Sequence, residues 1–113
     1  MVGRESGEIR LEVAEDASGG SVVGHVAGAC LIDAAVATDD WRGYDPLAAT
    51  GRAHERVSRQ GPKSTWARDD DGDGVREVHC NSMEGVWTGL RNFLRPFRGV
   101  SKWRLDEYVA VFQ

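Results

Sequence analysis

The sequence predicts an α/β fold, because segments with the periodicity of strands alternate with segments with the periodicity of helices. Residues 9–13 alternate between apolar and polar side chains, as in a half-buried strand. Residues 34–37 form a short, unbroken apolar run, which suits a strand covered on both faces. From Asn81 onward, apolar residues recur at helical spacing until Pro96 ends the run.

Length and composition indicate one ordinary globular domain, covering residues 1–113. The chain has 113 residues, of which 41% are apolar and 28% charged. Its apolar stretches are too short to span a bilayer, and the N-terminal segment has no apolar core like that of a signal peptide. Cys30 and Cys80 lack metal-ligand spacing. We therefore expect a cytoplasmic protein with reduced thiols and no membrane partner.

The first half of the chain predicts a strand, a helix and a second strand. Ser6–Gly7 is typical of a tight turn before the strand at residues 9–13, so residues 1–4 would be the stub of a preceding strand. Ser21 can cap a helix whose apolar stripe is Val22, Val23, Val26, Ala27, Cys30 and Leu31. The run at residues 34–37 then ends in the polar residues 38–40.

The second half predicts mainly helices. Asp45–Pro46 can begin a short helix that Gly51 stops. Residues 54–57 suit a short strand, and residues 61–78 are polar and typical of a loop. The long helix from Asn81 has its apolar positions at Met83, Val86, Trp87, Leu90, Leu94 and Phe97. A shorter helix from about Lys102 has a buried stripe of Leu105, Tyr108, Val109 and Phe112.

The charge distribution limits where a phosphate could be bound. The net charge of −4 argues against a nucleic-acid partner for the chain as a whole. Residues 1–80 carry 9 basic and 15 acidic side chains, however, whereas residues 81–113 carry 5 basic and 3 acidic ones. Phosphate contacts would therefore come from the C-terminal third. The alternative is that Arg91, Arg95, Arg98, Lys102 and Arg104 only form a solvated face.

An acidic segment, residues 69–80, starts like a calcium-binding loop. Asp69, Asp71 and Asp73 have the ligand spacing, and Gly74 stands where the sharp turn belongs. The twelfth position should be a bidentate glutamate but is Cys80. We therefore interpret this segment as a solvated surface loop that does not bind calcium tightly.

Three polar residues allow two interpretations. Asp39 follows a predicted strand, where ligands and metals gather in α/β sheets. Asn81 and Glu84 have the spacing of a capping box, which satisfies backbone N–H groups at the start of a helix and needs no further function. The functional interpretation is that carboxylates from a strand end and a helix start converge on magnesium.

Two segments resemble a known family. Residues 38–44 read TDDWRGY, and residues 79–113 read HCNSMEGVWTGLRNFLRPFRGVSKWRLDEYVAVFQ. They are similar to the T-D-G-W-x-G-Y segment and to the closing H-T-N-x-I-E-G-F-W segment of ISXO-like insertion-sequence transposases. The segments EIRLEVAEDAS and TGRAHERV agree more loosely with that family. The resemblance covers most of the chain and is most specific in its closing segment.

The resemblance implies an RNase H-like mixed sheet flanked by helices, and magnesium- or manganese-dependent cleavage and transfer of DNA strands at transposon ends. It implies that Asp39 is the second catalytic aspartate, Asn81 the asparagine of the motif and Glu84 its accompanying glutamate, with Asp39 and Glu84 as metal ligands. Their side chains should approach within about 10 Å, near enough to share a metal site. Arg91, Arg95, Arg98 and Lys102 would contact DNA phosphates.

The sequence departs from the family pattern at three places, one of which is the acidic loop around Asp69 to Asp73, which looks like a local insertion or drift. Asp40 stands where the family has glycine. The family's first catalytic aspartate lies on a strand before those predicted here, so we expect this chain to lack the first strand and to be inactive alone. The alternative function is a non-catalytic remnant that regulates transposition by binding DNA or full-length transposase. A sheet edge left unpaired would favour a homo-oligomer.

Overall fold

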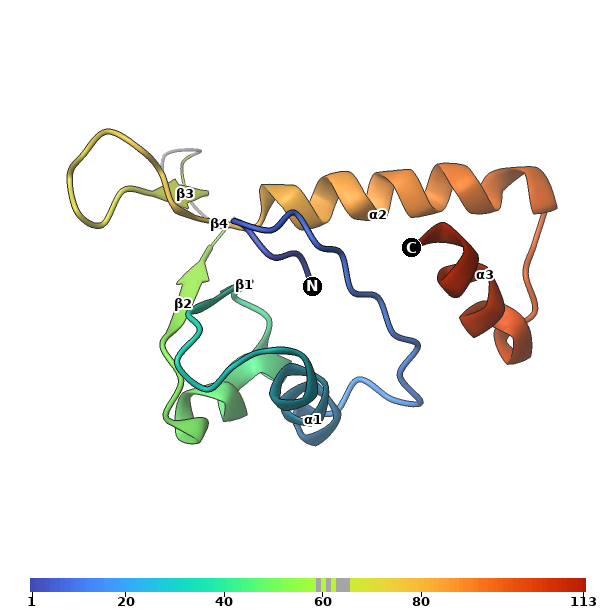
Figure 1. Ribbon diagram of the computed structural model, residues 1–113, viewed down its shortest axis with the longest axis horizontal. Helices are drawn as coiled ribbons and strands as arrows, with labels where there is room; N and C mark the ends of the chain where they lie inside the picture. The colour runs from blue at the N-terminus through green and yellow to red at the C-terminus, as the bar shows by residue number, and fades with distance from the viewer. Residues whose placement is uncertain (59, 61, 63–65) are drawn as a thin grey trace. The chain divides into compact units, whose positions relative to one another are not determined.

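The computed structural model describes residues 1–58, 60, 62 and 66–113 (Figure 1). It shows a mixed α/β chain, which confirms the predicted class at that level. The chain divides into two compact units. One comprises residues 16–80, and the other joins residues 1–15 to residues 81–113. Within the described ranges, no helix has the length and apolar character needed to cross a membrane.

The unit of residues 16–80 contains two small sheets. Its elements are α1 (Gly19–Ala29), β1 (Val36–Asp39), η1 (Arg42–Thr50), β2 (His54–Val57), β3 (Ala67–Arg68) and β4 (Val78–His79). Strands β1 and β2 pair in parallel, and strands β3 and β4 pair antiparallel. Leu47 of η1 is only 1% exposed, and Val26 of α1 and Val57 of β2 are also buried. Helix α1 packs against η1, so these apolar side chains form the interior of the unit.

Strand β2 confirms the strand predicted at residues 54–57. Strand β1 begins two residues later than predicted, because the N–H of Ala34 donates to the carbonyl of Leu31 in a turn. Pairing starts only where the N–H of Val36 donates to the carbonyl of Ala53, at 2.8 Å. Within β1, Val36 and Ala37 are half-buried, Thr38 is buried and Asp39 is exposed, whereas Ala35, just before the strand, is exposed.

Helix α1 is capped by Ser18, and the prediction of Ser21 as the cap is wrong. The Ser18 hydroxyl accepts from the N–H of Ser21 at 3.2 Å. A carboxylate oxygen of Asp16 accepts from the N–H of Ser18 at 2.8 Å and from the hydroxyl of Ser21 at 2.6 Å. These hydrogen bonds lower the pKa of Asp16 to about 2. The helix also ends before Leu31, which is 77% exposed instead of belonging to the buried stripe.

The segment after β1 turns in 3-10 rather than α-helical geometry. Element η1 begins at Arg42, before the predicted start at Asp45, and contains Pro46. Gly51 ends it in the left-handed conformation with φ of 77°, as predicted. The loop predicted for residues 61–78 instead carries β3 and the start of β4, with Val78 buried. Residues 61 and 63–65 of that loop lie outside the described part of the chain.

The second unit is built around two helices. Its elements are α2 (Asn81–Leu94), η3 (Arg95–Phe97), η4 (Lys102–Arg104) and α3 (Leu105–Phe112). Leu11, Leu90 and Val109 form its buried core, flanked by Met83, Val86, Phe93, Leu94, Leu105 and Phe112. The chain end is held to the N-terminal segment, because the N–H of Leu11 donates to the side-chain oxygen of Gln113.

The strand predicted at residues 9–13 is wrong. Gly7 makes the predicted turn, with φ of 70°, and Val2 and Ile9 form one isolated antiparallel bridge. Beyond that bridge, the N–H of Leu11 is satisfied by a side chain rather than by a neighbouring strand. Leu11 is buried but Val13 is 41% exposed, so the alternating pattern reflects one apolar anchor and not a sheet face.

The two C-terminal helices confirm the predicted periodicity, with two exceptions on the long helix stripe. Leu90 and Val109 are buried, and the remaining stripe of α3 is at least half-buried. Trp87 and Phe97, however, are 48% and 46% exposed. Helix α2 packs on one face against α3, so apolar positions at the edge of that face stay in contact with solvent.

Candidate functional site

Asp39 is the last residue of β1, at the carboxyl end of the strand as predicted. Its side chain is exposed, and its Oδ1 accepts from the N–H of Trp41 at 3.1 Å. That hydrogen bond turns the chain sharply away from the strand and orients the carboxylate. The neighbouring Asp40 carboxylate is bound differently, because it accepts from the Ser58 hydroxyl at 2.7 Å.

The residues after Asp39 form a tight aromatic turn. The rings of Trp41 and Tyr44 meet edge to face, with centroids 5.2 Å apart and planes at 87°. A Cβ atom on Gly43 would lie 2.0 Å from the Trp41 ring, so only glycine fits beneath it. Burial raises the pKa of Tyr44, and the negative charge of Asp39 raises it further. The W-R-G-Y spacing is therefore a packing requirement beside Asp39.

A hydrogen-bonded pair lies behind Asp39 in the β1–β2 sheet. The buried Thr38 hydroxyl lies 2.9 Å from Nε2 of His54 and also donates to the carbonyl of Asp39 at 2.8 Å. The hydroxyl proton is used in that second bond, so Nε2 of His54 acts as the donor. Burial lowers the pKa of His54, and Arg56 lowers it further. A neutral His54 thus supports the backbone at Asp39.

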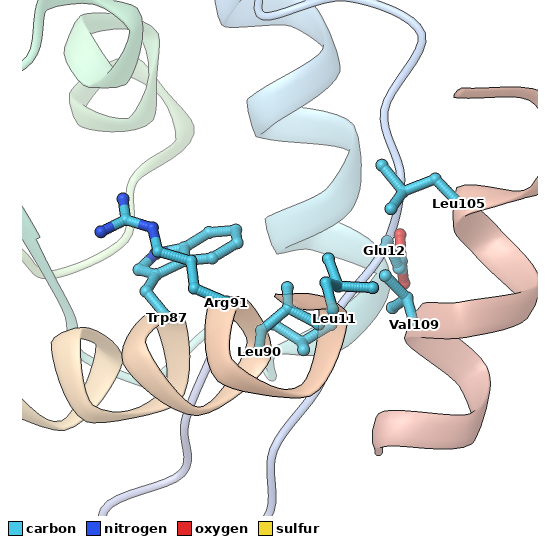
Figure 2. Close-up of a pocket in the computed structure, with 8 residues that line it drawn as sticks. Leu11, Glu12, Trp87, Leu90, Arg91, Leu105 and Val109 are labelled. Carbon is cyan, nitrogen blue, oxygen red and sulfur yellow. The ribbon is translucent and has the colours of Figure 1, made fainter. Parts of the chain in front are cut away.

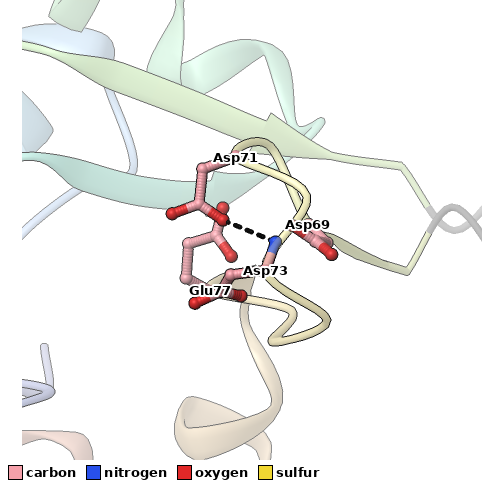
Figure 3. A group of neighbouring side chains, drawn as sticks. All are labelled: Asp69, Asp71, Asp73 and Glu77. Carbon is pink, nitrogen blue, oxygen red and sulfur yellow. Dashed lines mark hydrogen bonds between the residues drawn. The ribbon is translucent and has the colours of Figure 1, made fainter.

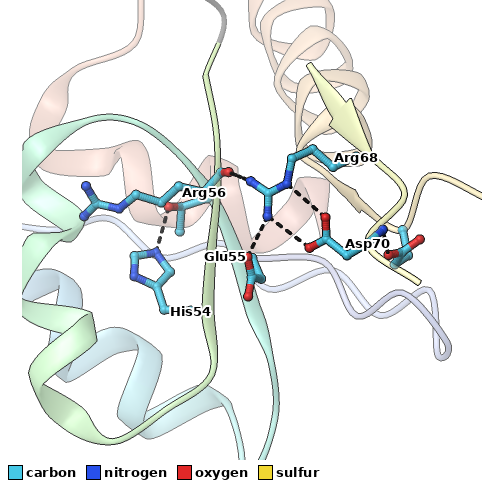
Figure 4. Close-up of polar contacts among 7 residues, drawn as sticks. His54, Glu55, Arg56, Arg68 and Asp70 are labelled. Carbon is cyan, nitrogen blue, oxygen red and sulfur yellow. Dashed lines mark hydrogen bonds and ion pairs between the residues drawn. The ribbon is translucent and has the colours of Figure 1, made fainter. Parts of the chain in front are cut away.

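Ion pairs surround the end of β2 (Figure 4). Arg68 of β3 reaches Glu55 of β2 at 2.7 Å and Asp70 at 3.1 Å, and it donates to the carbonyl of Arg56. Arg56 itself pairs with Asp45 at 2.7 Å. These contacts are partly exposed, so each contributes little to stability. The Arg68 contacts join β3 to β2, and the Arg56–Asp45 pair joins β2 to η1, so these two arginines are poor candidates for phosphate contacts.

Asn81 and Glu84 lie in the first turn of α2, as predicted. Asn81 is exposed and Glu84 half-buried. The helix begins at Asn81 itself, whereas a capping box places the capping residue just before the first helical residue. The reciprocal capping hydrogen bonds stay a prediction. Asp39 belongs to the unit of residues 16–80 and Glu84 to the other unit, so their approach also stays a prediction.

The C-terminal unit contains two adjoining hollows beside α2, which together we call the α2 trough; Figure 2 shows residues that line the first. Two hollows of about 320 and 440 Å³ make up the trough. The first includes Trp87, Leu90 and Val109, the second includes Arg95 and Arg98, and both share Arg91, Leu94 and Leu105. Three of the predicted DNA-binding residues thus lie along one groove. Lys102 lies outside this lining, with its amino group 4.5 Å from the centre of the Trp103 ring.

The acidic loop brings four carboxylates together (Figure 3). Ligand atoms of Asp69, Asp71, Asp73 and Glu77 lie within 4.8 Å of one another. Several of these groups bind the loop's own backbone: Asp69 accepts from the N–H groups of Gly72 and Gly74, at 2.6 and 2.8 Å, which lowers its pKa. Glu77 was not predicted, although it occupies the ninth position of the calcium-loop pattern.

The ISXO2-like transposase domain matches the chain over residues 1–113. The chain belongs to this transposase family. It is also 37% identical, over 79 residues, to an uncharacterized protein in transposable element ISH50 of Halobacterium salinarum. No solved structure gives a match.

The ISH50 alignment covers 69% of this chain and 24% of the halobacterial protein. The chain therefore spans about a quarter of the length of this relative. Membership of the ISXO2-like family places Asp39, Asn81 and Glu84 in a transposase domain, and the resemblance seen in residues 38–44 and 79–113 is confirmed at the level of the family.

Sequence reasoning missed the exposed position of Trp87 in the α2 trough. Trp87 and Arg91 are four residues apart on α2 and project to the same side (Figure 2). That spacing was visible in the sequence. The helical stripe alone could not show that the packing of α3 stops short of Trp87.

Replacing Gly43 should disturb the turn that carries Asp39. In Gly43→Ala, the new methyl group meets the Trp41 ring, which must move and lose its contact with Tyr44. We expect a loss of about 1–3 kcal/mol in the free energy of unfolding, measured by urea denaturation. Gly24→Ala is the matched control, because a Cβ there meets nothing within 4 Å. Equal stability of the two variants would contradict the packing requirement.

The acidic loop should bind calcium only weakly. Cys80 occupies the position of the bidentate glutamate, and several carboxylates already accept from loop N–H groups. Titration calorimetry should show no micromolar affinity for calcium. Micromolar binding that disappears in Asp71→Ala would overturn this prediction.

Proposed function

We propose that this chain acts in DNA transposition, contributing residues to magnesium-dependent cleavage and transfer of DNA strands. The observation that carries the proposal is the family match over residues 1–113, together with Asp39 at the end of a strand and Glu84 in the first turn of a long helix. Strand ends and helix starts are where α/β proteins gather the ligands of phosphate-transfer metals.

The proposed architecture is a single RNase H-like domain over residues 1–113. It is supported by family membership and by the parallel pairing of β1 with β2, which sets Asp39 at a carboxyl edge. In that architecture Asp39, Asn81 and Glu84 share one active site. Asp39 and Glu84 hold the metal, and Asn81 orients a ligand or the start of α2.

The side chains of this site fit a magnesium ion. Magnesium prefers oxygen ligands, keeps several waters and needs only one or two carboxylates from the protein. The Asp39 carboxylate is exposed and uses Oδ1 for the Trp41 N–H, and no other hydrogen bond to it is formed by the described residues. Bound magnesium, or manganese, would stabilise the charge that develops when a phosphodiester bond is cut. The chain's own residues supply the oxygen ligands and their orientation.

Arginines of the C-terminal unit are the proposed contacts to DNA phosphate. Arg91, Arg95 and Arg98 are exposed and line the α2 trough, and Lys102 is exposed nearby in the sequence. Arginine binds phosphate through several N–H donors at once. Such contacts do not depend on the base sequence, so they can position DNA of any sequence.

Binding of DNA should therefore fade steeply with salt. Four phosphate contacts predict a slope of about −3 to −4 in a plot of log affinity against log salt concentration. Arg91→Gln or Arg95→Gln should each reduce the slope by about one, measured by fluorescence anisotropy with duplex DNA. Arg76→Gln, in the acidic loop, is the matched control. A slope near zero would contradict the proposed phosphate contacts.

Metal binding tests the catalytic residues directly. Manganese affinity should be measured by titration calorimetry in an Asp71→Ala background, so that the acidic loop contributes less. Asp39→Asn and Glu84→Gln should each weaken manganese binding. If both residues hold the same ion, combining the two substitutions should lower the affinity no more than abolishing that one site. Asp40→Asn is the control, because that carboxylate is engaged by Ser58. Unchanged affinity in both Asp39→Asn and Glu84→Gln would exclude this metal site.

A further inference from the structure

The α2 trough differs in chemistry between its two ends. One end is apolar and aromatic, lined by Trp87, Leu90 and Val109, and Glu12 lines it on the side of Val109 (Figure 2). The other end is cationic, lined by Arg95 and Arg98. Arg91 and Leu94 line both hollows, so the two ends of the trough adjoin along α2. A ligand that fits both ends must carry a flat apolar group and negative charges in one chain.

We propose that the α2 trough binds an unpaired DNA strand, with one base stacked on Trp87 and the adjoining phosphates bound by Arg91, Arg95 and Arg98. This inference rests on the proposed function and specifies the DNA that the surface accepts. Bases stack on exposed indole rings whatever their identity, and a cationic groove follows the backbone.

The position of Trp87 supports a stacking role. It is 48% exposed, although its neighbours on the α2 stripe, Met83, Val86 and Leu90, are at least half-buried. An indole left half in water at the edge of a core carries an apolar surface that a base could cover. Its side chain projects to the same side as Arg91, one turn further along α2 (Figure 2).

The charges set the direction of the bound strand. Glu12 also lines the first hollow, but it lies beside Leu105 and Val109 and away from Trp87 (Figure 2), with its carboxylate 3.9 Å from the guanidinium of Arg10. The three arginines lie from the middle of the trough to its other end. A nucleotide is therefore placed with its base at Trp87 and its phosphate toward Arg91 and Arg95.

Base stacking at Trp87 requires an unpaired nucleotide. In a duplex each base is stacked on both faces and paired at its edge, so only phosphates and groove edges reach a protein surface. The first hollow, about 320 Å³, is at the lower end of the sizes usual for small-ligand pockets, roughly 300–1,000 Å³, and suits one base. Single strands or frayed duplex ends would occupy the whole trough, whereas intact duplex would use only its arginines.

Affinity for matched single-stranded and duplex oligonucleotides tests the proposal, measured by fluorescence anisotropy on the full chain. Trp87→Leu should weaken single-strand binding by roughly 5- to 100-fold, the usual effect of losing one stacked base, and leave duplex binding unchanged. Trp87→Phe keeps an aromatic ring and should retain most of the affinity. Val111→Ala is the control, because Val111 is 76% exposed and does not line the trough.

A ligand variant makes the test independent of protein folding. A single-stranded oligonucleotide with abasic sites should bind wild-type protein as weakly as the normal strand binds Trp87→Leu. Equal binding of normal and abasic strands, or no effect of Trp87→Leu on either DNA, would overturn the stacking proposal while the duplex contacts stand. Absence of binding to every DNA would instead refute the proposed function. Tight capture of an acidic, aromatic peptide in place of either DNA would show that the trough is a protein-docking site.

Discussion

The packing of α2 against α3 determines what the C-terminal unit can present to a ligand. Leu11, Leu90 and Val109 meet in one small core, and this contact sets the rotation of α2 about its axis. With Leu90 turned inward, Trp87 and Arg91 face the trough. The mixed aromatic and cationic surface is thus a consequence of where a few apolar side chains are buried.

A different constraint positions Asp39. Parallel strands need a crossover between them, and here the short element η1 provides it, anchored by the fully buried Leu47. The chain must therefore turn immediately after β1. The turn is made by the Trp41 N–H bond to the Asp39 carboxylate and by the close approach of the Trp41 ring to Gly43. The packing of the Trp41 ring on Gly43 therefore also determines how the Asp39 carboxylate is oriented.

The carboxylates of the acidic loop and the carboxylate of Asp39 lie in different surroundings. In the loop of residues 69–77 the carboxylates cluster, and they accept from nearby backbone N–H groups, Asp69 through both oxygens and Asp71 and Asp73 through one each, which stabilises the loop itself. Asp39 uses one oxygen for such a bond and remains exposed at the end of a strand. Electrostatic proximity alone therefore does not identify a metal site.

Sequence patterns alone predict the C-terminal helices, the strand at residues 54–57 and the family. Helical spacing from Asn81 to Leu94 and the stop near Pro96 are local properties, and the segments at residues 38–44 and 79–113 are similar to the transposase family at those positions. Which of the periodic residues are buried depends instead on tertiary contacts. Leu11 packs into a core without forming a strand, and Trp87 stays exposed despite its helical register, because burial depends on contacts between segments distant in sequence.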